Sequence, residues 1–468
     1  MMGRKLLLLA ALLSAGGTGR RPAPATPPPS EVAEAATPAY ATPDVPAPQV
    51  PFDPAAPGLL GPMVGHTTDD AVTFWIRAPG AARLRAVIAK PGGGIEDEET
   101  ALNPDGTGVA TVDGLEAGTR YTARFQLDGR PLGADRAATF TTFAPPGEPT
   151  RLRIALVSCA RTAWDSLQPI WTAVAADRPD IVLWLGDNNY FEAHGDSVPG
   201  DWESPVTMAG QYAALRGLPT LQPLLRQAAQ YAIWDDHDYA DGAPDRRFPL
   251  RDAVARLFES FWANPSYGAD GPDGIYSRFE AGDVEVFLLD GRYWRDPEET
   301  TEGPGKSLLG AGQKEWLKER LAASDARLKI VALGIQVLAD YHEYDGYHHF
   351  AHERDELLDW IRDRRIGGVV FVSGDRHLSE LMRWERPGSY PLYELTASPA
   401  ANRFFPDGLK QPNPIRVAGY SAGPNYGLLD IDTRADPATI VFRIKDIAGV
   451  EVLTQAVPLD ELQDTVPR

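Results

Sequence analysis

The fold of this chain is decided by the stretch Ile181-Val182-Leu183-Trp184-Leu185-Gly186-Asp187-Asn188-Asn189-Tyr190, an apolar run that stops at a glycine and a carboxylate. Such a run predicts a buried parallel strand whose carboxyl end presents polar groups. In open α/β sheets, ligands bind in the crevice beyond these strand ends, so Asp187 and Tyr190 are expected to face a site. The alternative is a plain turn in which Asp187 caps the next helix.

The same pattern, an apolar run followed by polar groups, recurs at four other places. The polar segments are Ser158-Cys159-Ala160-Arg161, Asp235-Asp236-His237-Asp238, Asp290-Gly291-Arg292 and Ser373-Gly374-Asp375-Arg376-His377. If these strands share a sheet, their polar ends converge on one cleft, which favours a functional site over unrelated turns. The pattern predicts an α/β fold.

These strand ends also carry a family resemblance. The motifs Gly-Asp-Asn-Asn-Tyr, Trp-Asp-Asp-His-Asp, Asp-Gly-Arg and Ser-Gly-Asp-Arg-His-Leu-Ser-Glu-Leu occur in this order between about residues 151 and 432. Together they resemble the PhoD-like alkaline phosphatase family, within the wider calcineurin-like and purple-acid-phosphatase group. The resemblance implies a four-layer αββα sandwich and a phosphoric ester hydrolase acting on monoesters, diesters or both.

The resemblance further implies a dinuclear metal site. In the wider group the ligands stand in Gly-Asp-x-x-Asp or Tyr, then Asn-His, then Gly-His-x-His. The corresponding residues here, with the single cysteine added, are Cys159, Asp187, Tyr190, Asp236, Asp375 and His377. A carboxylate has two oxygens to share, so Asp187 suits a position between two ions.

Two metal ions about 3.5–4 Å apart activate a water as hydroxide and clamp the phosphoryl oxygens of an ester. The anionic thiolate and phenolate, with His377, suit a highly charged ion such as Fe(III). The oxygen ligands Asp236 and Asp375 suit a second ion such as Ca(II), with other divalent metals as alternatives.

Other motif residues suggest roles in binding and proton transfer. His237 lies beside the second ion in the motif, where it is either a ligand or a proton donor to the leaving group. Arg161, Arg292 and Arg376 are candidates for phosphate contact, and Arg292 is the best placed by its motif. For each arginine, a structural salt bridge is the alternative. The expected catalytic residues are Asp187, His237 and Arg292.

Two other classes of function compete with a metal-dependent phosphatase. The first is a non-catalytic phosphate- or polymer-binding protein on the same fold, which the full set of ligands argues against. The second is a serine- or cysteine-based hydrolase that uses Cys159 and His237. No nucleophile-elbow motif surrounds Cys159, and sensitivity to chelators would separate the two mechanisms.

Length and charge limit the partners. The chain has 468 residues, a formal net charge of −20 and one cysteine. It is therefore long enough for two or three domains and cannot form an intramolecular disulfide. The negative charge disfavours a broad nucleic-acid-binding surface and anionic membranes. A small or polymeric phosphate ester would need local positive charge, which bound metal ions supply.

The N-terminus predicts export. Residues 1–19 place Arg4 and Lys5 before an apolar run and small residues, which is typical of a signal peptide. The run is too short to span a bilayer, so we expect a periplasmic or secreted protein without a stable membrane anchor. A retained anchor is the alternative. Residues 20–57, rich in proline and alanine, are expected to form a linker.

Two folded domains are expected to follow. Over residues 58–145, short alternating strands predict a small β-sandwich that resembles a fibronectin type III domain. Residues 150–468 would then form the metallophosphatase catalytic domain. Early in that part, Trp164, Leu167, Ile170, Trp171 and Val174 recur at helical spacing and predict a crossover helix.

Four histidines stand close together in the sequence. They are His342, His348, His349 and His352. The i,i+4 spacing of His348 and His352 would allow a separate metal site. The favoured interpretation is a surface loop that borders the pocket. The family usually has an aromatic residue near this place, so the histidines are a departure from its pattern.

Overall fold

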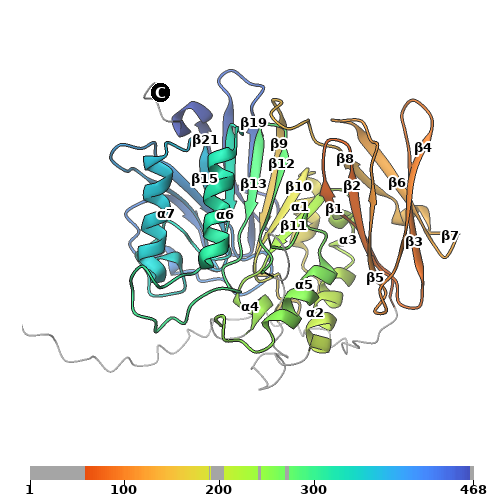
Figure 1. Cartoon of the computed structure of the whole chain (residues 1–468), viewed down its shortest axis with the longest axis horizontal. Helices are drawn as coiled ribbons and strands as arrows, with labels where there is room; N and C mark the ends of the chain where they lie inside the picture. Colours follow the sequence, from red (N-terminus) through yellow and green to blue (C-terminus); the bar gives the residue numbers. More distant parts are fainter. Residues whose placement is uncertain (1–57, 189, 191–204, 241–243, 269–272, 464–468) are drawn as a thin grey trace, which may run out of the picture. The chain divides into compact units, whose positions relative to one another are not determined.

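The computed structural model describes residues 58–188, 190, 205–240, 244–268 and 273–463. These residues belong to one compact unit, Ala47–Arg468 (Figure 1). The predicted signal peptide over residues 1–19 and linker over residues 20–57 lie outside the described residues. Within the described part of the chain, no helix combines the length and apolar character needed to cross a membrane.

The first part of the described chain contains two antiparallel sheets. Aromatic side chains fill the space between them, with the ring of Phe74 5.0 Å from Phe125 and 5.6 Å from Phe140. The predicted β-sandwich strands are present, while the resemblance to fibronectin type III stays a prediction. One sheet contains β1 (Leu60–Thr67), β2 (Val72–Arg77) and β5 (Thr107–Val112), and the other contains β3 (Arg83–Ala89), β4 (Ile95–Ala101), β6 (Arg120–Leu127), β7 (Arg130–Pro131) and β8 (Ala138–Thr141).

A six-stranded sheet follows, and it contains the stretch that decides the fold. Residues Ile181–Leu185 form β10, which is buried throughout and pairs in parallel with both of its neighbours. The predicted buried parallel strand is therefore confirmed. In spatial order the strands are β11 (Ala229–Ile233), β10, β9 (Arg151–Val157), β19 (Asn425–Asp432), β20 (Thr439–Asp446) and β21 (Glu451–Pro458).

A seven-stranded sheet packs against the six-stranded one. The rings of Tyr393 in β17 and Phe442 in β20 stack across the two sheets with centroids 5.6 Å apart. Strands β13, β14, β15 and β17 run parallel. In spatial order the strands are β12 (Ser277–Ala281), β13 (Val284–Leu288), β14 (Leu328–Ala332), β15 (Val369–Ser373), β17 (Leu392–Thr396), β16 (Ser379–Trp384) and β18 (Arg416–Tyr420).

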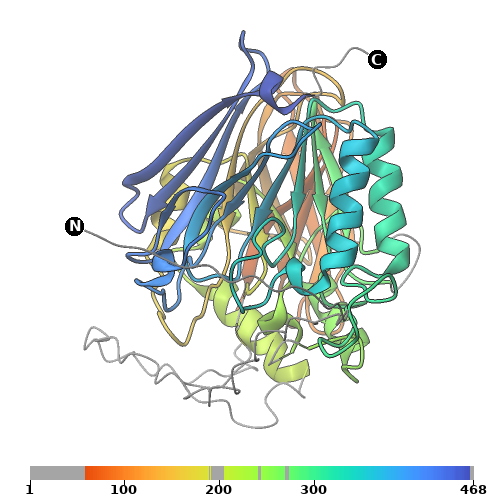
Figure 2. The same cartoon turned by 90° about the vertical axis from the view of Figure 1, so that its left-hand side faces the viewer.

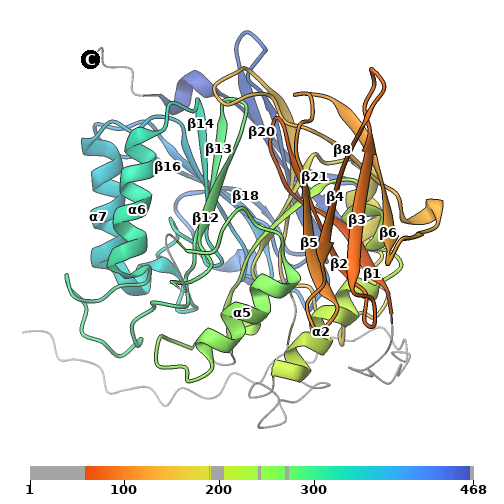
Figure 3. The same cartoon turned by 45° about the vertical axis from the view of Figure 1, so that its right-hand side comes forward.

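Helices cover the seven-stranded sheet and one end of the strands. Figures 1 and 2 show α6 and α7 together over one face of that sheet, where Lys314 and Lys318 of α6 bind Glu356 of α7 at 2.8 and 2.6 Å. At one end of the strands, α2 lies beside α5 (Figures 1 and 3). The helices are α1 (Ile170–Ala176), α2 (Pro205–Gly217), α3 (Gln222–Leu225), α4 (Asp236–Tyr239), α5 (Arg251–Phe261), α6 (Gly310–Ala323) and α7 (Ala351–Asp363).

The crossover helix is shorter than its apolar spacing predicts. It begins at Ile170, so Trp164 and Leu167 lie before it. The reason is a local turn, in which Asp165 Oδ1 accepts the backbone N–H groups of Leu167 and Gln168 at 2.9 and 3.0 Å. An aspartate that binds nearby backbone groups in this way competes with helix formation.

One buried arginine lies between the N-terminal sheets and the six-stranded sheet. Arg216, near the end of α2, is fully buried. Its guanidinium lies 3.9 Å from the ring centroid of Trp262, 5.8 Å from that of Trp75 and 5.9 Å from that of Trp184. Trp75 belongs to β2 and donates its indole N–H to the Ser260 carbonyl at 2.7 Å. The N-terminal sheets are therefore part of the packing that holds α2.

This contact predicts a large effect of Trp75→Ala on stability. The substitution would leave a cavity beside a buried cation, so we expect the free energy of unfolding in urea to fall by about 3–5 kcal/mol. Val109→Ala is the matched control, because Val109 lies opposite Trp75 on β5 but is 38% exposed. Its loss should be about 0.5 kcal/mol or less. Equal losses for the two variants would contradict the packing role of Trp75.

Candidate metal centre

The centre forms where the six-stranded and seven-stranded sheets meet, at the carboxyl ends of β9, β10, β11 and β15. A glycine permits this approach. A Cβ atom on Gly374, just after β15, would lie 2.6 Å from the Leu185 carbonyl oxygen and 2.7 Å from Ser158 Cβ. Only a residue without a side chain fits so close to the neighbouring sheet. The polar segments that follow these strands consequently converge.

The first ligand group consists of Cys159, Asp187, Tyr190 and His377. The Tyr190 hydroxyl donates to Asp187 Oδ2 at 2.9 Å and lies 3.1 Å from His377 Nε2. Cys159 Sγ lies 3.5 Å from the same Asp187 oxygen. A thiol, a carboxylate, a phenol and an imidazole therefore converge, and they are the four side chains expected around the first ion.

The second ligand group consists of Asp235, Asp236 and Asp375, whose ligand atoms lie within 4.8 Å of one another. Asp187, Asp236 and His237 meet the same spacing. Since Asp187 and Asp236 each belong to two of these sets, the ligand atoms form one continuous chain across the centre. Asp187 belongs to the first group and also meets this spacing with Asp236 of the second, a position that would suit a bridging ligand.

Four of the predicted ligands have a backbone conformation that is rare outside glycine. The φ angles of Cys159, Asp187, Asp375 and His377 are 55°, 50°, 63° and 51°. Side chains other than glycine avoid this region because Cβ crowds the backbone. Strain of this kind persists where the surrounding structure imposes it, commonly at functional sites. Its concentration on four ligands favours a functional role for the centre.

Burial governs the acidity of the ligands. It raises the pKa of the Asp187 carboxyl well above its usual range, and the nearby Asp236 raises it further. Burial likewise raises the pKa of the Cys159 thiol and of the Tyr190 phenol. It raises the pKa of Asp375 to about 7. These acids are crowded into a space of low polarity, where a positive charge would favour their anionic forms.

The donors fit metal ions. Carboxylate oxygens, imidazole nitrogens and the Cys159 sulfur lie at the spacing of shared coordination sites, and Asp236 Oδ1 is buried without a hydrogen-bond partner among the described residues. Buried carboxylates in native proteins are normally paired or bound to a metal. A cation at the centre would satisfy this oxygen.

Arg292 lies behind the carboxylates and is closed off from solvent. It is fully buried, and its Nε donates to Asp235 Oδ1 at 2.7 Å. Its Nη2 lies 2.9 Å from Asp345 Oδ2. Because the guanidinium is shared between two carboxylates, this placement disfavours the predicted phosphate contact. It favours a positioning role for Arg292 instead.

The other two predicted arginines lie beside the ligands. The Arg161 guanidinium is 5.6 Å from the ring centroid of Tyr190. Arg376 follows the ligand Asp375 directly, and its guanidinium lies 4.6 Å from the ring centroid of Tyr344. Both positions allow the predicted contact with phosphate, in contrast to that of Arg292.

His237 lies between the two ligand groups. Its ring packs on Tyr190 with centroids 4.1 Å apart, and its backbone N–H donates to Asp187 Oδ1 at 3.3 Å. The side chain also belongs to the set with Asp187 and Asp236. Both sequence-based alternatives, ligand or proton donor, are compatible with this position.

Sequence reasoning missed the carboxylates that support the ligands. Asp238 is fully buried and accepts backbone N–H groups from Asn188 and Asp235, at 3.1 and 3.2 Å. It also accepts the Tyr212 hydroxyl at 3.2 Å. Asp235 itself belongs to the second ligand group. The available signal was the run of three acids in residues 235–238, of which only Asp236 is predicted as a ligand.

The four histidines do not lie together on one surface loop. His342 is only 8% exposed, and its Nε2 lies 3.0 Å from Gln336 Oε1, so the predicted surface position is wrong for this residue. His352 is exposed near the start of α7. Within the described residues, the pair of His348 and His352 is not among the groups spaced to hold a metal.

One of these histidines does meet the spacing of a metal site, together with Glu298 and Asp345. This residue is His349, whose ring pairs with Glu298. However, Asp345 already binds Arg292 and Arg295, each at 2.9 Å. Glu298 also pairs with Arg295, at 2.9 Å. These arginines already offset the carboxylate charges, so the group is better explained as an ion-pair network.

Comparison of the sequence with known proteins identifies related enzymes. A family model described as PhoD-like phosphatase matches residues 154–435. Alkaline phosphatase D of Bacillus subtilis (strain 168) is 25% identical over 382 residues, which are 69% of this chain and 65% of that protein. The match therefore spans less than two thirds of the curated relative.

Comparison of the fold agrees with that of the sequence. A solved structure described as that of PhoD superposes with a TM-score of 0.70 at 19% identity, over 88% of this chain and 94% of that one. A purple acid phosphatase from yellow lupin (Lupinus luteus) seeds superposes with a TM-score of 0.64 at 12% identity, over 88% of this chain and 77% of that one. At these identities the likeness concerns the fold, and the predicted metallophosphatase sandwich is confirmed.

The first ligand group predicts a coloured protein. A phenolate bound to Fe(III) absorbs visible light by charge transfer, which Ca(II) and Zn(II) do not produce. Tyr190→Phe should therefore bleach the purified protein and lower its iron content, measured by absorption spectroscopy and elemental analysis. Tyr344→Phe is the control, because this tyrosine is 50% exposed and packs on Arg376 outside the ligand groups. Colour that survives Tyr190→Phe would contradict the assignment of Tyr190.

Proposed function

The chain belongs to the PhoD-like phosphatase family, and from that membership we propose that it hydrolyses phosphate esters with a centre of two metal ions. One observation carries the proposal: the two ligand groups are linked through Asp187 and Asp236 into a single chain of ligand atoms. The proposed substrates are phosphomonoesters, phosphodiesters or both, on small or polymeric molecules.

The donor types support two different ions. In the first ligand group, Cys159, Tyr190 and His377 would hold Fe(III). The all-oxygen second ligand group would hold Ca(II) or another divalent ion. Asp187 would contribute to both sites. When bound, the two ions would lower the pKa of a bound water and offset the negative charge of the phosphoryl group.

The remaining side chains would bind and orient the ester. Arg161 and Arg376 would hold the non-bridging phosphate oxygens through charge-assisted hydrogen bonds. The imidazole of His237 would hold a proton near the ester and transfer it to the leaving-group oxygen. Arg292 would act indirectly, because it binds Asp235 and so fixes one carboxylate of the second ligand group.

The two competing functions fit the site less well. A protein that only binds phosphate would not need the complete set of ligands. A cysteine nucleophile needs access to substrate and a lowered pKa. Cys159 is fully buried, and burial raises the pKa of its thiol. Cys159 is therefore better suited to hold a metal than to attack a substrate.

We also propose that the protein is exported and that its described part contains two domains. Export to the periplasm or the exterior is supported by the leader-like composition of residues 1–19. We place the domain boundary between residues 145 and 150, because the strands of the first two sheets end before it and β9 begins just after it. The net charge of −20 argues against a broad nucleic-acid interface, so a phosphate ester would bind through the local positive charge of the metal ions.

Loss of a ligand carboxylate is expected to abolish hydrolysis. Asp187→Asn and Asp375→Asn should each reduce the rate on nitrophenyl phosphate and on the bis-nitrophenyl diester to near zero. Both should also lower the metal content while the circular dichroism spectrum stays normal. His352→Ala is the control and should keep full activity, because His352 is exposed and belongs to neither ligand group.

Two outcomes would count against the two-metal proposal. One is a rate above about a tenth of wild type in either aspartate variant, since that corresponds to less than ~1.4 kcal/mol of barrier. The other is full activity after removal of all metal by a chelator. Full activity without metal would instead favour the cysteine-based mechanism.

A further inference from the structure

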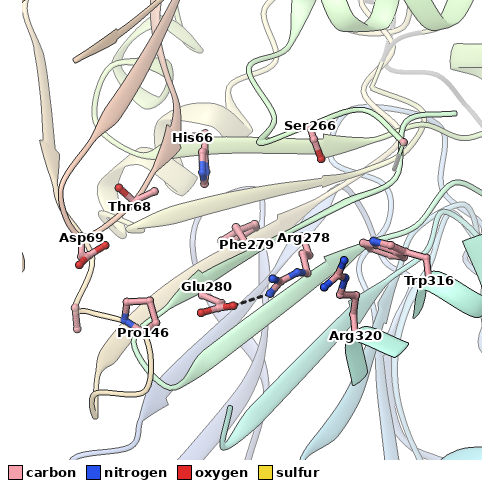
Figure 4. Close-up of a pocket in the computed structure, with 12 residues that line it drawn as sticks. His66, Thr68, Asp69, Pro146, Ser266, Arg278, Phe279, Glu280, Trp316 and Arg320 are labelled. Atoms are coloured by element: carbon pink, nitrogen blue, oxygen red, sulfur yellow. Dashed lines mark hydrogen bonds and ion pairs between the residues drawn. The ribbon is translucent and has the colours of Figure 1, made fainter. Parts of the chain in front are cut away.

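A pocket of about 470 Å³ lies apart from the ligand groups. Its walls come from the end of β1, the segment after β8, β12 and α6 (Figure 4). The lining includes no member of either ligand group. Its volume falls in the range of small-molecule sites, which often lie where two parts of a fold meet.

The pocket follows the free edge of the seven-stranded sheet. β12 is the outermost strand of that sheet. Arg278, Phe279 and Glu280, three successive residues of β12, all line the pocket. Successive side chains of a strand point to opposite faces. A pocket that touches three in a row must therefore lie along the edge of the strand.

On the outer side of β12, the backbone groups form hydrogen bonds at both ends of the strand but not between them. Gly268 N–H donates to the Tyr276 carbonyl at 2.9 Å, and Gly282 N–H donates to the Ala144 carbonyl at 3.1 Å. In an antiparallel pair, residues two apart direct their backbone groups to the same side. The backbone N–H and C=O groups of residues 278 and 280 consequently also point outward. On that side they form no backbone hydrogen bond with other described residues.

An unpaired cation stands at one end of this open edge. Arg278 is neutralised by Glu280, at 2.6 Å, and by Glu285. By contrast, Arg320 of α6 points into the pocket (Figure 4) and has no hydrogen bond or ion pair with the described residues. One turn earlier, Trp316 adds a half-buried aromatic wall. A free guanidinium of this kind binds carboxylates in a two-pronged geometry.

We propose that this pocket binds a short extended peptide, with its main chain on β12 and its terminal carboxylate on Arg320. A peptide main chain presents N–H and C=O groups at the two-residue repeat that the open edge offers, so it adds as a further strand. Two outward residues correspond to a segment of about three residues, or about 10 Å. Asp69, at the opposite end of the pocket, would attract the amino group (Figure 4).

Calorimetric titration of the full chain with the tripeptide Ala-Val-Ala tests the proposal. The free peptide should bind, and its C-terminal amide should bind at least about tenfold more weakly. Arg320→Ala should weaken the free peptide to the level of the amide and remove the difference between the two. Arg130→Ala, which changes an exposed arginine on β7, should behave like wild type.

A second peptide tests the backbone pairing. Methylation of the central amide nitrogen removes one main-chain donor, so it should weaken binding even with Arg320 intact. Equal binding of the free and amidated peptides would overturn the carboxylate assignment. Absence of heat for every peptide up to about 1 mM would overturn the site. A third outcome is that no peptide binds, while inorganic phosphate binds the wild-type protein but not Arg320→Ala. That result would overturn the peptide site and assign the pocket to small anions.

Peptide binding at this pocket does not depend on the proposed phosphatase activity. Arg320 contacts neither ligand group, so Arg320→Ala should leave the hydrolysis rate of nitrophenyl phosphate unchanged. A peptide site could survive in a protein without turnover, and turnover could survive without peptide binding.

Discussion

Repulsion between closely spaced carboxylates at the ends of β10, β11 and β15 is the constraint on which the site depends. Asp187, Asp235, Asp236 and Asp375 are brought together by strands whose apolar residues fill the core. Like charges so close in a medium of low polarity do not all stay ionised without a counter-charge. Arg292 offsets part of this charge from behind. Metal ions would offset the rest, which gives a physical reason for a metal-dependent centre at this place.

The same constraint explains why the support of the centre reaches far into the molecule. Asp238 fixes the loops after β10 and β11, and Tyr212 of α2 binds it in turn. On the same helix, Arg216 is held among tryptophans, one of which is Trp75 of the N-terminal sheets. These sheets therefore contribute to the packing around the helix that supports the ligands. The N-terminal sheets thus support the centre through packing, although none of the candidate ligands comes from them.

The convergence of the candidate ligands could be predicted from sequence because each motif is local, an apolar strand followed at once by its polar residues. The placement of Arg292 could not, because its guanidinium pairs with Asp345, which comes from a distant loop. The first residue of α1 could not be predicted from the spacing of apolar residues either, because the side chain of Asp165 forms a competing turn. His342 is buried beside Gln336, whose side chain binds Glu380 and Thr396 of distant strands, a tertiary arrangement that local composition does not encode.

The most direct test of a two-metal centre is anomalous X-ray diffraction from crystals of the purified, active protein, with data collected above and below the iron edge. The account predicts an iron peak within the first ligand group. It also predicts a second metal peak about 3.5–4 Å away, within the second ligand group. Asp187 should touch both ions. A single peak, or metal ions bound only elsewhere in a fully active protein, would contradict it.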